Sequence, residues 1–257
     1  MTDTRHRLAP DRLIGAPLTP EDRMAAIVLL TATALLLVFE YWGRPGFYLS
    51  SGLRDRVASM ESDQFSDLAD ALGYVWWGLS SVVWRVLVPL GIGVWVLHLR
   101  PADLGYRLVG IGRHLPAYGI AYLVMLPLLI WVSGFESFGS YYPFYERAVE
   151  GGAGLWVYWA GYALQFVGVE AFFRGYLTFG LAPRFGWLAV PIMTVPYTMI
   201  HFAKPMPEAV AAIGAGLVLG TMALRSRSWV PGVFLHVAVA LTLDILVMVR
   251  AGAIDLL

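Results

Sequence analysis

The chain has 257 residues, of which 58% are hydrophobic and 14% charged, and its mean hydropathy is +0.66. Soluble domains carry about 25% charged residues, so this composition excludes an ordinary soluble protein and indicates a polytopic protein with the lipid bilayer as its surroundings. The formal net charge is zero, so we expect no nucleic-acid partner. The absence of cysteine excludes disulfides, cysteine-ligated zinc and a thiol nucleophile.

Seven segments approach the roughly 20 apolar residues that a transmembrane helix needs. They cover residues 24–42, 74–98, 115–133, 154–179, 187–202, 208–224 and 230–249. The sequence Thr19-Pro20-Glu21-Asp22 favours a helix start, with a capping hydroxyl, a proline in the first turn and acids at the positive end of the helix dipole. Arginines are more frequent in the flanks on the side of the N-terminus, which predicts that this side is cytoplasmic.

These segments divide the chain into four parts. We expect a cytoplasmic N-terminal segment (1–23), scaffold transmembrane helices (24–153), a catalytic core (154–249) and a C-terminal tail (250–257). The first three spans contain only Arg85 and the flanking His98 as notable polar groups, so we interpret them as scaffold, and nearly all candidate site chemistry lies in the last four spans.

The fourth segment contains two opposite charges in an otherwise apolar run. Glu170 and Arg174 lie four residues apart, the spacing at which opposite charges meet on one face of a helix. Charges at membrane depth are costly, usually pair, and often mark a functional site. The pair is either a structural link between helices or a general base, Glu170, whose carboxylate Arg174 holds.

Two later segments each contain a histidine. Tyr197 precedes His201 by one turn, in a helix that its prolines should kink. In the last segment Asp244 follows His236 at a rise of about 12 Å, so we expect both to border one cavity without sharing a close bond. Each histidine is either a hydrogen-bonded interior residue or a catalytic or metal-binding group.

The turn after His201 contains a second possible ion pair. Lys204 and Glu208 are spaced to meet across it, either as a capped tight turn or as a carboxylate-binding group near the site. In the sixth segment, Gly216 and Gly220 form a small-residue face that predicts close helix packing.

One carboxylate and two histidines in a water-filled membrane cavity suit amide hydrolysis. Glu170 would deprotonate a water, and His201 and His236 would orient that water or stabilise the developing oxyanion. The same three residues are also candidate ligands for a divalent metal such as zinc, with an open position for water. We therefore predict an all-α fold: a polytopic transmembrane bundle of about seven spans with a polar active-site cavity within the membrane.

The ordered polar motifs are Glu170-xxx-Arg174-Gly175, Tyr197-xxx-His201 and His236. This set resembles the three motifs of the CPBP intramembrane proteases, which include the type II CAAX prenyl endopeptidases and bacterial relatives linked to bacteriocin processing or self-immunity. The likeness covers about residues 154–249. It implies a helical membrane core with a cavity open to the cytosol, in a bacterial inner membrane. It also implies a CAAX-type endopeptidase that acts on membrane-associated peptides or proteins, with its metal requirement left open.

The chain departs from the family pattern at two positions. The family motif begins with paired glutamates, and Val169 stands where the first, the expected base, would be. Ala240 stands where the family has Asn or Asp, and we take Asp244, one turn further, as its substitute. With Glu170 as the base the protein is an active endopeptidase. The alternatives are a catalytically inactive membrane interaction or immunity protein, and a proton-coupled transporter that uses Glu170, Asp244 and the histidines as a relay.

Overall fold

A computed structural model describes residues 17–59 and 68–253, and the regular secondary structure of this part of the chain is entirely helical. The predicted all-α fold is therefore confirmed for the described residues. Most of the predicted N-terminal segment 1–23 and half of the predicted tail 250–257 lie outside them.

The first half of the chain forms three long helical rods and several short helices. Their elements are α2 (Pro20–Val38), η1 (Phe39–Gly43), α3 (Pro45–Ser50), α4 (Leu53–Ala58), α6 (Leu72–Val82), η2 (Val83–Leu87), α7 (Val88–Gly91), η3 (Ile92–Val96), η4 (Pro101–Leu104), η5 (Gly112–His114), α8 (Leu115–Val132), α9 (Glu136–Gly139) and η6 (Glu146–Glu150). The first rod begins as predicted, because Thr19 caps α2 in a reciprocal capping box with Asp22.

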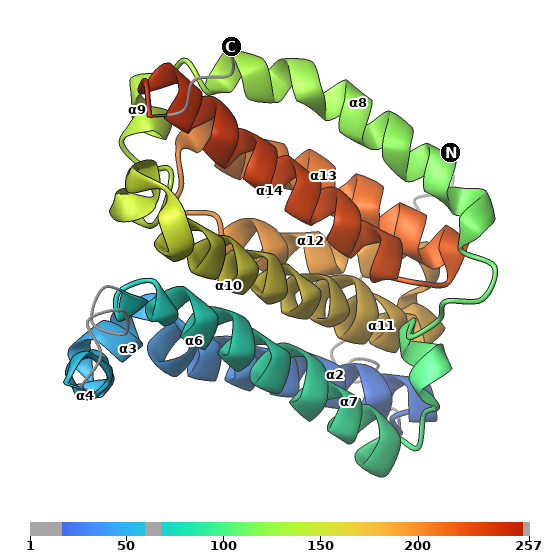
Figure 1. Ribbon diagram of the computed structural model, residues 1–257. Coiled ribbons are helices and arrows are strands. Elements are labelled where there is room, and N and C mark those ends of the chain that lie inside the picture. Colours follow the sequence, from blue (N-terminus) through green and yellow to red (C-terminus); the bar gives the residue numbers. More distant parts are fainter. Residues whose placement is uncertain (1–16, 60–67, 254–257) are drawn as a thin grey trace, which may run out of the picture.

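The second half contains the elements that carry the sequence motifs. They are α10 (Gly152–Glu170), η7 (Ala171–Leu177), α11 (Thr178–Phe185), η8 (Gly186–Leu188), α12 (Ala189–Met199), α13 (Met206–Ser226) and α14 (Val230–Arg250). The elements α10, η7 and α11 follow one another without a break and form a single central rod (Figure 1).

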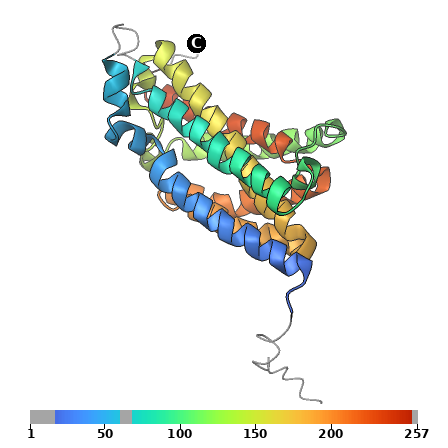
Figure 2. The same cartoon turned by 90° about the horizontal axis from the view of Figure 1, so that it is seen from below.

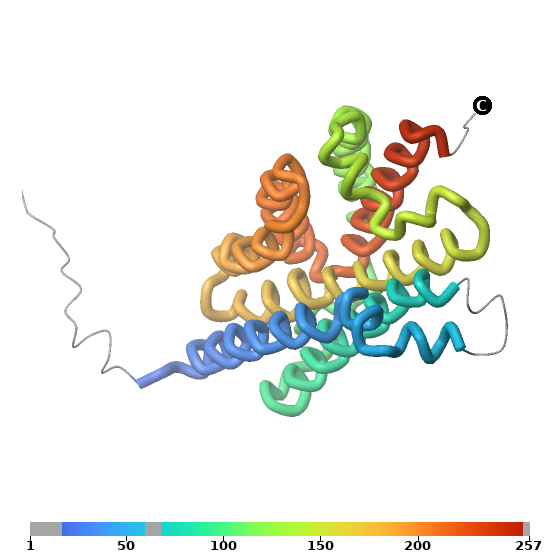
Figure 3. Tube along the Cα trace, turned by 90° about the vertical axis from the view of Figure 1, so that its left-hand side faces the viewer, coloured from blue at the N-terminus to red at the C-terminus, as the bar shows by residue number. Residues whose placement is uncertain are grey.

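The central rod lies between two groups of helices. In Figure 1, α2, α6 and α7 lie below α10 and α11, while α14, α13 and α8 lie above them. Figure 2 shows the same close neighbourhood of α6 and α10 from below, and Figure 3 shows α2 running beside the central rod. The rod therefore contacts helices from both halves of the chain.

Small residues allow the closest of these contacts. A Cβ atom on Gly78 of α6 would lie 2.6 Å from the carbonyl oxygen of Gly161 in α10. On the other side of the bundle, a Cβ atom on Gly216 would lie 2.7 Å from Thr194, and one on Gly220 would lie 2.8 Å from Val190. The close packing predicted from Gly216 and Gly220 is thus confirmed, and α12 is the helix that packs there.

Among residues 17–59 and 68–253, five helices are long and apolar enough to cross a membrane, by length and composition. They cover Pro20–Gly43, Leu72–Val96, Gly112–Val132, Met206–Ser226 and Val230–Arg250. Large apolar side chains such as Leu123, Val124 and Trp131 are exposed along α8, as expected for a lipid-facing surface. The protein is therefore an integral membrane protein.

The predicted count of about seven spans stays a prediction. The predicted fourth span lies on the central rod, which is not among those five helices. The predicted fifth span contains α12, whose 11 residues extend only about 16 Å. That length is about half of a bilayer's hydrocarbon core, so α12 would need its flanking turns to cross.

Candidate active site

The site centres on the point where α10 passes into the π-helical turn η7. Glu170 is the last residue of α10, Arg174 lies within η7, and both side chains are fully buried. Arg174 Nη1 donates to Glu170 Oε1 at 3.0 Å, so the ion pair predicted from their spacing forms. Single π-helical turns inside helices are frequent at functional sites, because they change the direction in which side chains project.

Arg174 also joins the central rod to α12. Its guanidinium carbon lies 4.0 Å from the centroid of the Tyr197 ring, a cation–π contact. Its Nε and Nη2 atoms are buried and have no hydrogen-bond partner among the described residues. The strongest stabilising contacts of this buried cation are therefore Glu170 on its own rod and the Tyr197 face on the neighbouring helix.

His236 of α14 contacts the same carboxylate from the opposite side. Its Nδ1 lies 2.8 Å from Glu170 Oε1, and because an ionised carboxylate only accepts hydrogen bonds, Nδ1 carries the proton. Gly232 allows this approach, since a Cβ atom there would lie 2.5 Å from Glu170 Oε2. The Phe166 ring lies against the imidazole, at 4.3 Å between centroids. The contact leaves Nε2 of His236 without a protein partner among the described residues.

His201 lies in the turn after α12 and is oriented by its own backbone. Its Nδ1 lies 2.7 Å from the carbonyl oxygen of Tyr197. A carbonyl oxygen only accepts, so Nδ1 again carries the proton and Nε2 keeps its lone pair when the ring is neutral. Tyr197 thus fixes two site residues, Arg174 through its ring and His201 through its carbonyl group.

Both histidines line a cavity of about 700 Å³. Residues from several helices surround it, including Phe39, Glu40, Arg44, Phe47, Tyr74, Trp77, Arg85, Phe144, Phe166, Val169, His201, Lys204 and His236. Glu170 is not among the lining residues, although its neighbour Val169 is. The Glu170 carboxylate therefore does not face the cavity itself, but it is hydrogen-bonded to His236, which does. Val169, which stands where the family pattern has its first glutamate, lines the cavity directly.

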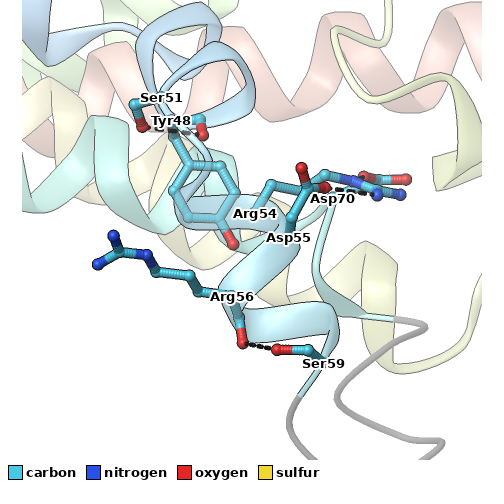
Figure 4. A network of polar contacts seen from close by, with 7 residues as sticks. All are labelled: Tyr48, Ser51, Arg54, Asp55, Arg56, Ser59 and Asp70. Atoms are coloured by element: carbon cyan, nitrogen blue, oxygen red, sulfur yellow. Dashed lines mark hydrogen bonds and ion pairs between the residues drawn. The ribbon is translucent and has the colours of Figure 1, made fainter.

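A short helical segment forms part of the cavity wall. Pro45, Phe47 and Ser50 of α3 line the cavity, and α3 leads directly into α4. Figure 4 shows the hydrogen bond that holds α4 in place. Arg54 Nε donates to Asp70 Oδ1 at 2.7 Å, and Asp70 lies just before α6 in the chain. This hydrogen bond raises the pKa of Arg54 above its usual value.

The three residues proposed from the sequence as zinc ligands do not form a zinc site. Among residues 17–59 and 68–253, no group of three or more His, Cys, Asp or Glu side chains is placed to hold a metal ion. Glu170 Oε1 faces His236 Nδ1 and Arg174, and Oε2 faces Gly232. Of the three candidate ligands only the two imidazoles therefore line the cavity, fewer than the three protein ligands of a catalytic zinc site.

Asp244 lies apart from this cavity. It is fully buried, and its Oδ2 accepts hydrogen bonds from Tyr158 Oη at 2.8 Å and Trp159 Nε1 at 3.3 Å. This corrects the expectation that His236 and Asp244 border one cavity. Two turns along α14 the helix surface has rotated towards the first half of α10, so Asp244 joins these two helices instead.

The predicted pair across the turn after α12 forms as a three-residue network. Lys204 Nζ donates to Glu208 Oε1 at 2.7 Å and to Tyr142 Oη at 3.2 Å, and Tyr142 donates to Glu208 Oε2 at 2.7 Å. Lys204 lines the cavity, whereas Glu208 does not. The pair therefore places an ammonium group at the cavity wall, next to the turn that carries His201.

Sequence reasoning noted Arg85 but did not assign it to the site. Arg85 lies in the scaffold half, where little polar chemistry was expected, and its side chain lines the same cavity as the histidines. The signal was present, because an arginine inside an apolar span usually faces the protein interior or a polar cavity.

Comparison with known proteins finds a family model that matches the segment in which the motif residues lie. Residues 151–242 match the family model described as type II CAAX prenyl endopeptidase Rce1-like. No curated protein and no solved structure matches the chain. The matched segment contains Glu170, Arg174, Tyr197, His201 and His236, which confirms the resemblance drawn from these motifs. Residues 151–242 of this membrane protein are thus similar to the Rce1-like type II CAAX prenyl endopeptidases, which is consistent with the CPBP intramembrane protease family.

Proposed function

We propose that the protein is an intramembrane endopeptidase that hydrolyses peptide bonds of membrane-associated proteins. One observation carries this proposal: the buried Glu170 carboxylate accepts the Nδ1 proton of His236, whose ring lines a cavity that it shares with His201. A carboxylate behind an imidazole fixes its tautomer and stabilises the imidazolium ion that forms when the ring takes a proton. The Rce1-like match of the same segment supports this activity class.

In the proposed mechanism Glu170 activates water through His236. Both imidazoles carry their protons on Nδ1, so both Nε2 lone pairs are available to the cavity. A water donating one hydrogen bond to each Nε2 is held with its oxygen free to attack a peptide carbonyl carbon. As the new C–O bond forms, the water proton moves to His236 Nε2. The same proton then passes to the departing amine when the C–N bond breaks.

The remaining site residues act on these groups without touching the reacting atoms. Arg174 holds the Glu170 carboxylate, and Tyr197 holds both Arg174 and His201. The Lys204–Glu208 pair positions the turn that carries His201 and supplies a positive charge at the cavity wall. We further propose that the N-terminus is cytoplasmic and that the membrane is a bacterial inner membrane.

The proposal is tested by comparing protein termini in cells. Membrane fractions that contain the wild-type protein are compared with fractions that contain Glu170→Gln at equal abundance. Asp244→Asn is the matched control, because it also replaces a fully buried carboxylate by an amide, outside the cavity. We expect new protein termini with the wild type and with Asp244→Asn, and none with Glu170→Gln. Identical termini in all three samples would contradict the proposal.

A second function is favoured by one position in the cavity wall. Val169 lines the cavity where the family pattern has a glutamate. A protein without a reacting carboxylate at this position would bind a membrane partner through the cavity without cleaving it, as an interaction or immunity protein. In that case Glu170→Gln keeps full biological function, and the terminus comparison separates the two.

A further inference from the structure

Arg85 is a buried cation without a protein partner of opposite charge. It lies in the π-helical turn η2, and its residue is only 5% exposed. Among residues 17–59 and 68–253 it makes no hydrogen bond and no ion pair, and its Nε atom is sealed from solvent without a partner. Its one strong contact is the Phe39 ring, whose centroid lies 3.5 Å from the guanidinium carbon.

The other cations in or near the cavity wall each form an ion pair with a carboxylate. Arg44 Nη1 lies 2.6 Å from Glu40 Oε1, and both side chains of this pair are exposed. Lys204 is paired with Glu208. Arg174, the second fully buried arginine, has Glu170. Arg85 is therefore the one arginine or lysine of the cavity wall, within the described residues, that has no carboxylate at ion-pair distance; Glu40 of the same wall acts on it only at longer range and is paired with Arg44.

Burial of an unpaired guanidinium group lowers the stability of the protein unless an anion binds to it. Removing a charge from water carries a penalty of several kcal/mol, which only a close opposite charge with good hydrogen bonds offsets. The planar guanidinium matches a carboxylate with two parallel hydrogen bonds. The apolar rings of Phe39, Trp77 and Phe144 around the cavity lower the local dielectric and strengthen such a pair.

The cavity also has room for a peptide. Its volume of about 700 Å³ lies within the range of about 300–1,000 Å³ that is usual for small-ligand sites. Its wall carries Arg85 from the scaffold half and the two histidines from the Rce1-like half. A peptide segment in it can contact both, so a charge on the segment would fix which peptide bond meets the histidines.

We propose that Arg85 is a carboxylate-binding subsite that anchors the substrate inside the cavity and sets the position of the cleaved bond. This inference rests on the proposed endopeptidase function. The carboxylate has two possible sources, the C-terminus of the substrate and an acidic side chain near the cleaved bond.

Three peptides of one apolar sequence distinguish these sources. One has a free C-terminal carboxylate, one has an amidated C-terminus, and one is amidated but carries a glutamate in place of a glutamine. Cleavage is measured with the purified full-length protein in nanodiscs of zwitterionic lipid. We expect kcat/KM for at least one carboxylate peptide to exceed that of the uncharged peptide by about tenfold or more. The preferred peptide identifies the source.

Variants of Arg85 test the residue itself. Arg85→Gln should cleave the carboxylate and uncharged peptides at similar rates, close to the wild-type rate on the uncharged peptide. Arg85→Lys keeps the charge but not the paired geometry, so it should keep part of the preference. Arg100→Gln is the control, because Arg100 is an exposed arginine that pairs with Asp103 outside the cavity wall. That variant should keep the full preference.

Two outcomes overturn the subsite. One is equal cleavage of all three peptides by the wild type, and the other is an equal loss on all three in Arg85→Gln, which indicates a purely structural role.

Binding of the same peptides to the Glu170→Gln variant is measured in parallel. If the wild type cleaves nothing but the variant binds the carboxylate peptide more tightly, the endopeptidase proposal fails and the subsite stands. Equal binding of all three peptides contradicts the subsite.

Discussion

Glu170 of α10 and Asp244 of α14 are both fully buried carboxylates, but they have different hydrogen-bond partners. Around Glu170 the partners are an arginine and a histidine, and the histidine lines the cavity. Around Asp244 the partners are the hydroxyl of Tyr158 and the indole of Trp159, and the group does not reach the cavity. In the proposed mechanism burial alone therefore does not make a carboxylate reactive. The mechanism also needs a partner that can take up a proton and that faces an open cavity.

The largest difference between the two regions should be seen in the rate of cleavage. His236→Gln keeps a polar side chain beside Glu170 but removes the titrating ring, so we expect cleavage to fall by about 10²–10⁴-fold. Asp244→Asn should leave the rate within about twofold of the wild type, because it changes no group of the cavity wall. Both rates are measured on a substrate found in the terminus comparison. A similar loss in the two variants would break the distinction between the regions.

The next largest effect concerns stability at Glu170. Arg174→Met removes the cation and leaves a fully buried carboxylate with only His236. Breaking a buried ion pair from one side typically costs about 3–5 kcal/mol, so we expect a loss of this size in the free energy of unfolding. The measurement is denaturant unfolding in detergent micelles.

The double variant Arg174→Met/Glu170→Gln is the control for this effect. It removes both charges, so it should be more stable than Arg174→Met alone. If the double variant is as unstable as the single one, the loss comes from packing around Arg174, for example against Tyr197, and not from the unpaired charge.

A smaller stability effect is expected in the Asp244 region. Asp244→Ala leaves the buried donor Tyr158 Oη and the part-buried donor Trp159 Nε1 without their acceptor. Unpaired buried donors cost about 1–3 kcal/mol, which should appear as a lower free energy of unfolding in the same denaturant series. The rate of cleavage per folded molecule should stay near the wild-type value. A large fall in that rate would show that Asp244 acts on the site across α10 and α14.

Local parts of the fold and the site could be predicted because they depend on neighbours in the chain. The capping box at Thr19, the Glu170–Arg174 pair and the Lys204–Glu208 pair join residues three or four positions apart. Helical geometry alone brings such side chains together. The apolar runs predicted about seven spans, and five helices of the described residues are long and apolar enough to cross a membrane.

Contacts between distant segments could not be predicted in the same way. Glu170 and His236 lie 66 positions apart, and their hydrogen bond needs α14 to approach α10 closely at Gly232. The expectation that Asp244 shares their cavity failed because the rotation of α14 was unknown before its packing was seen. Arg85 was assigned to the scaffold because no neighbour in the chain indicates that η2 faces the histidines.

The sequence by itself determined the membrane setting, the helical class, the motif residues and the pairs within single helices, since these follow from composition and helical periodicity. Only the tertiary structure decided which groups meet. It placed Val169 at the cavity wall and Glu170 behind His236, turned Asp244 towards Tyr158, and gave Arg85 a place beside the histidines. The physical reason is that glycine contacts and π-helical turns fix the separation and rotation of neighbouring helices, and these two quantities decide which side chains touch.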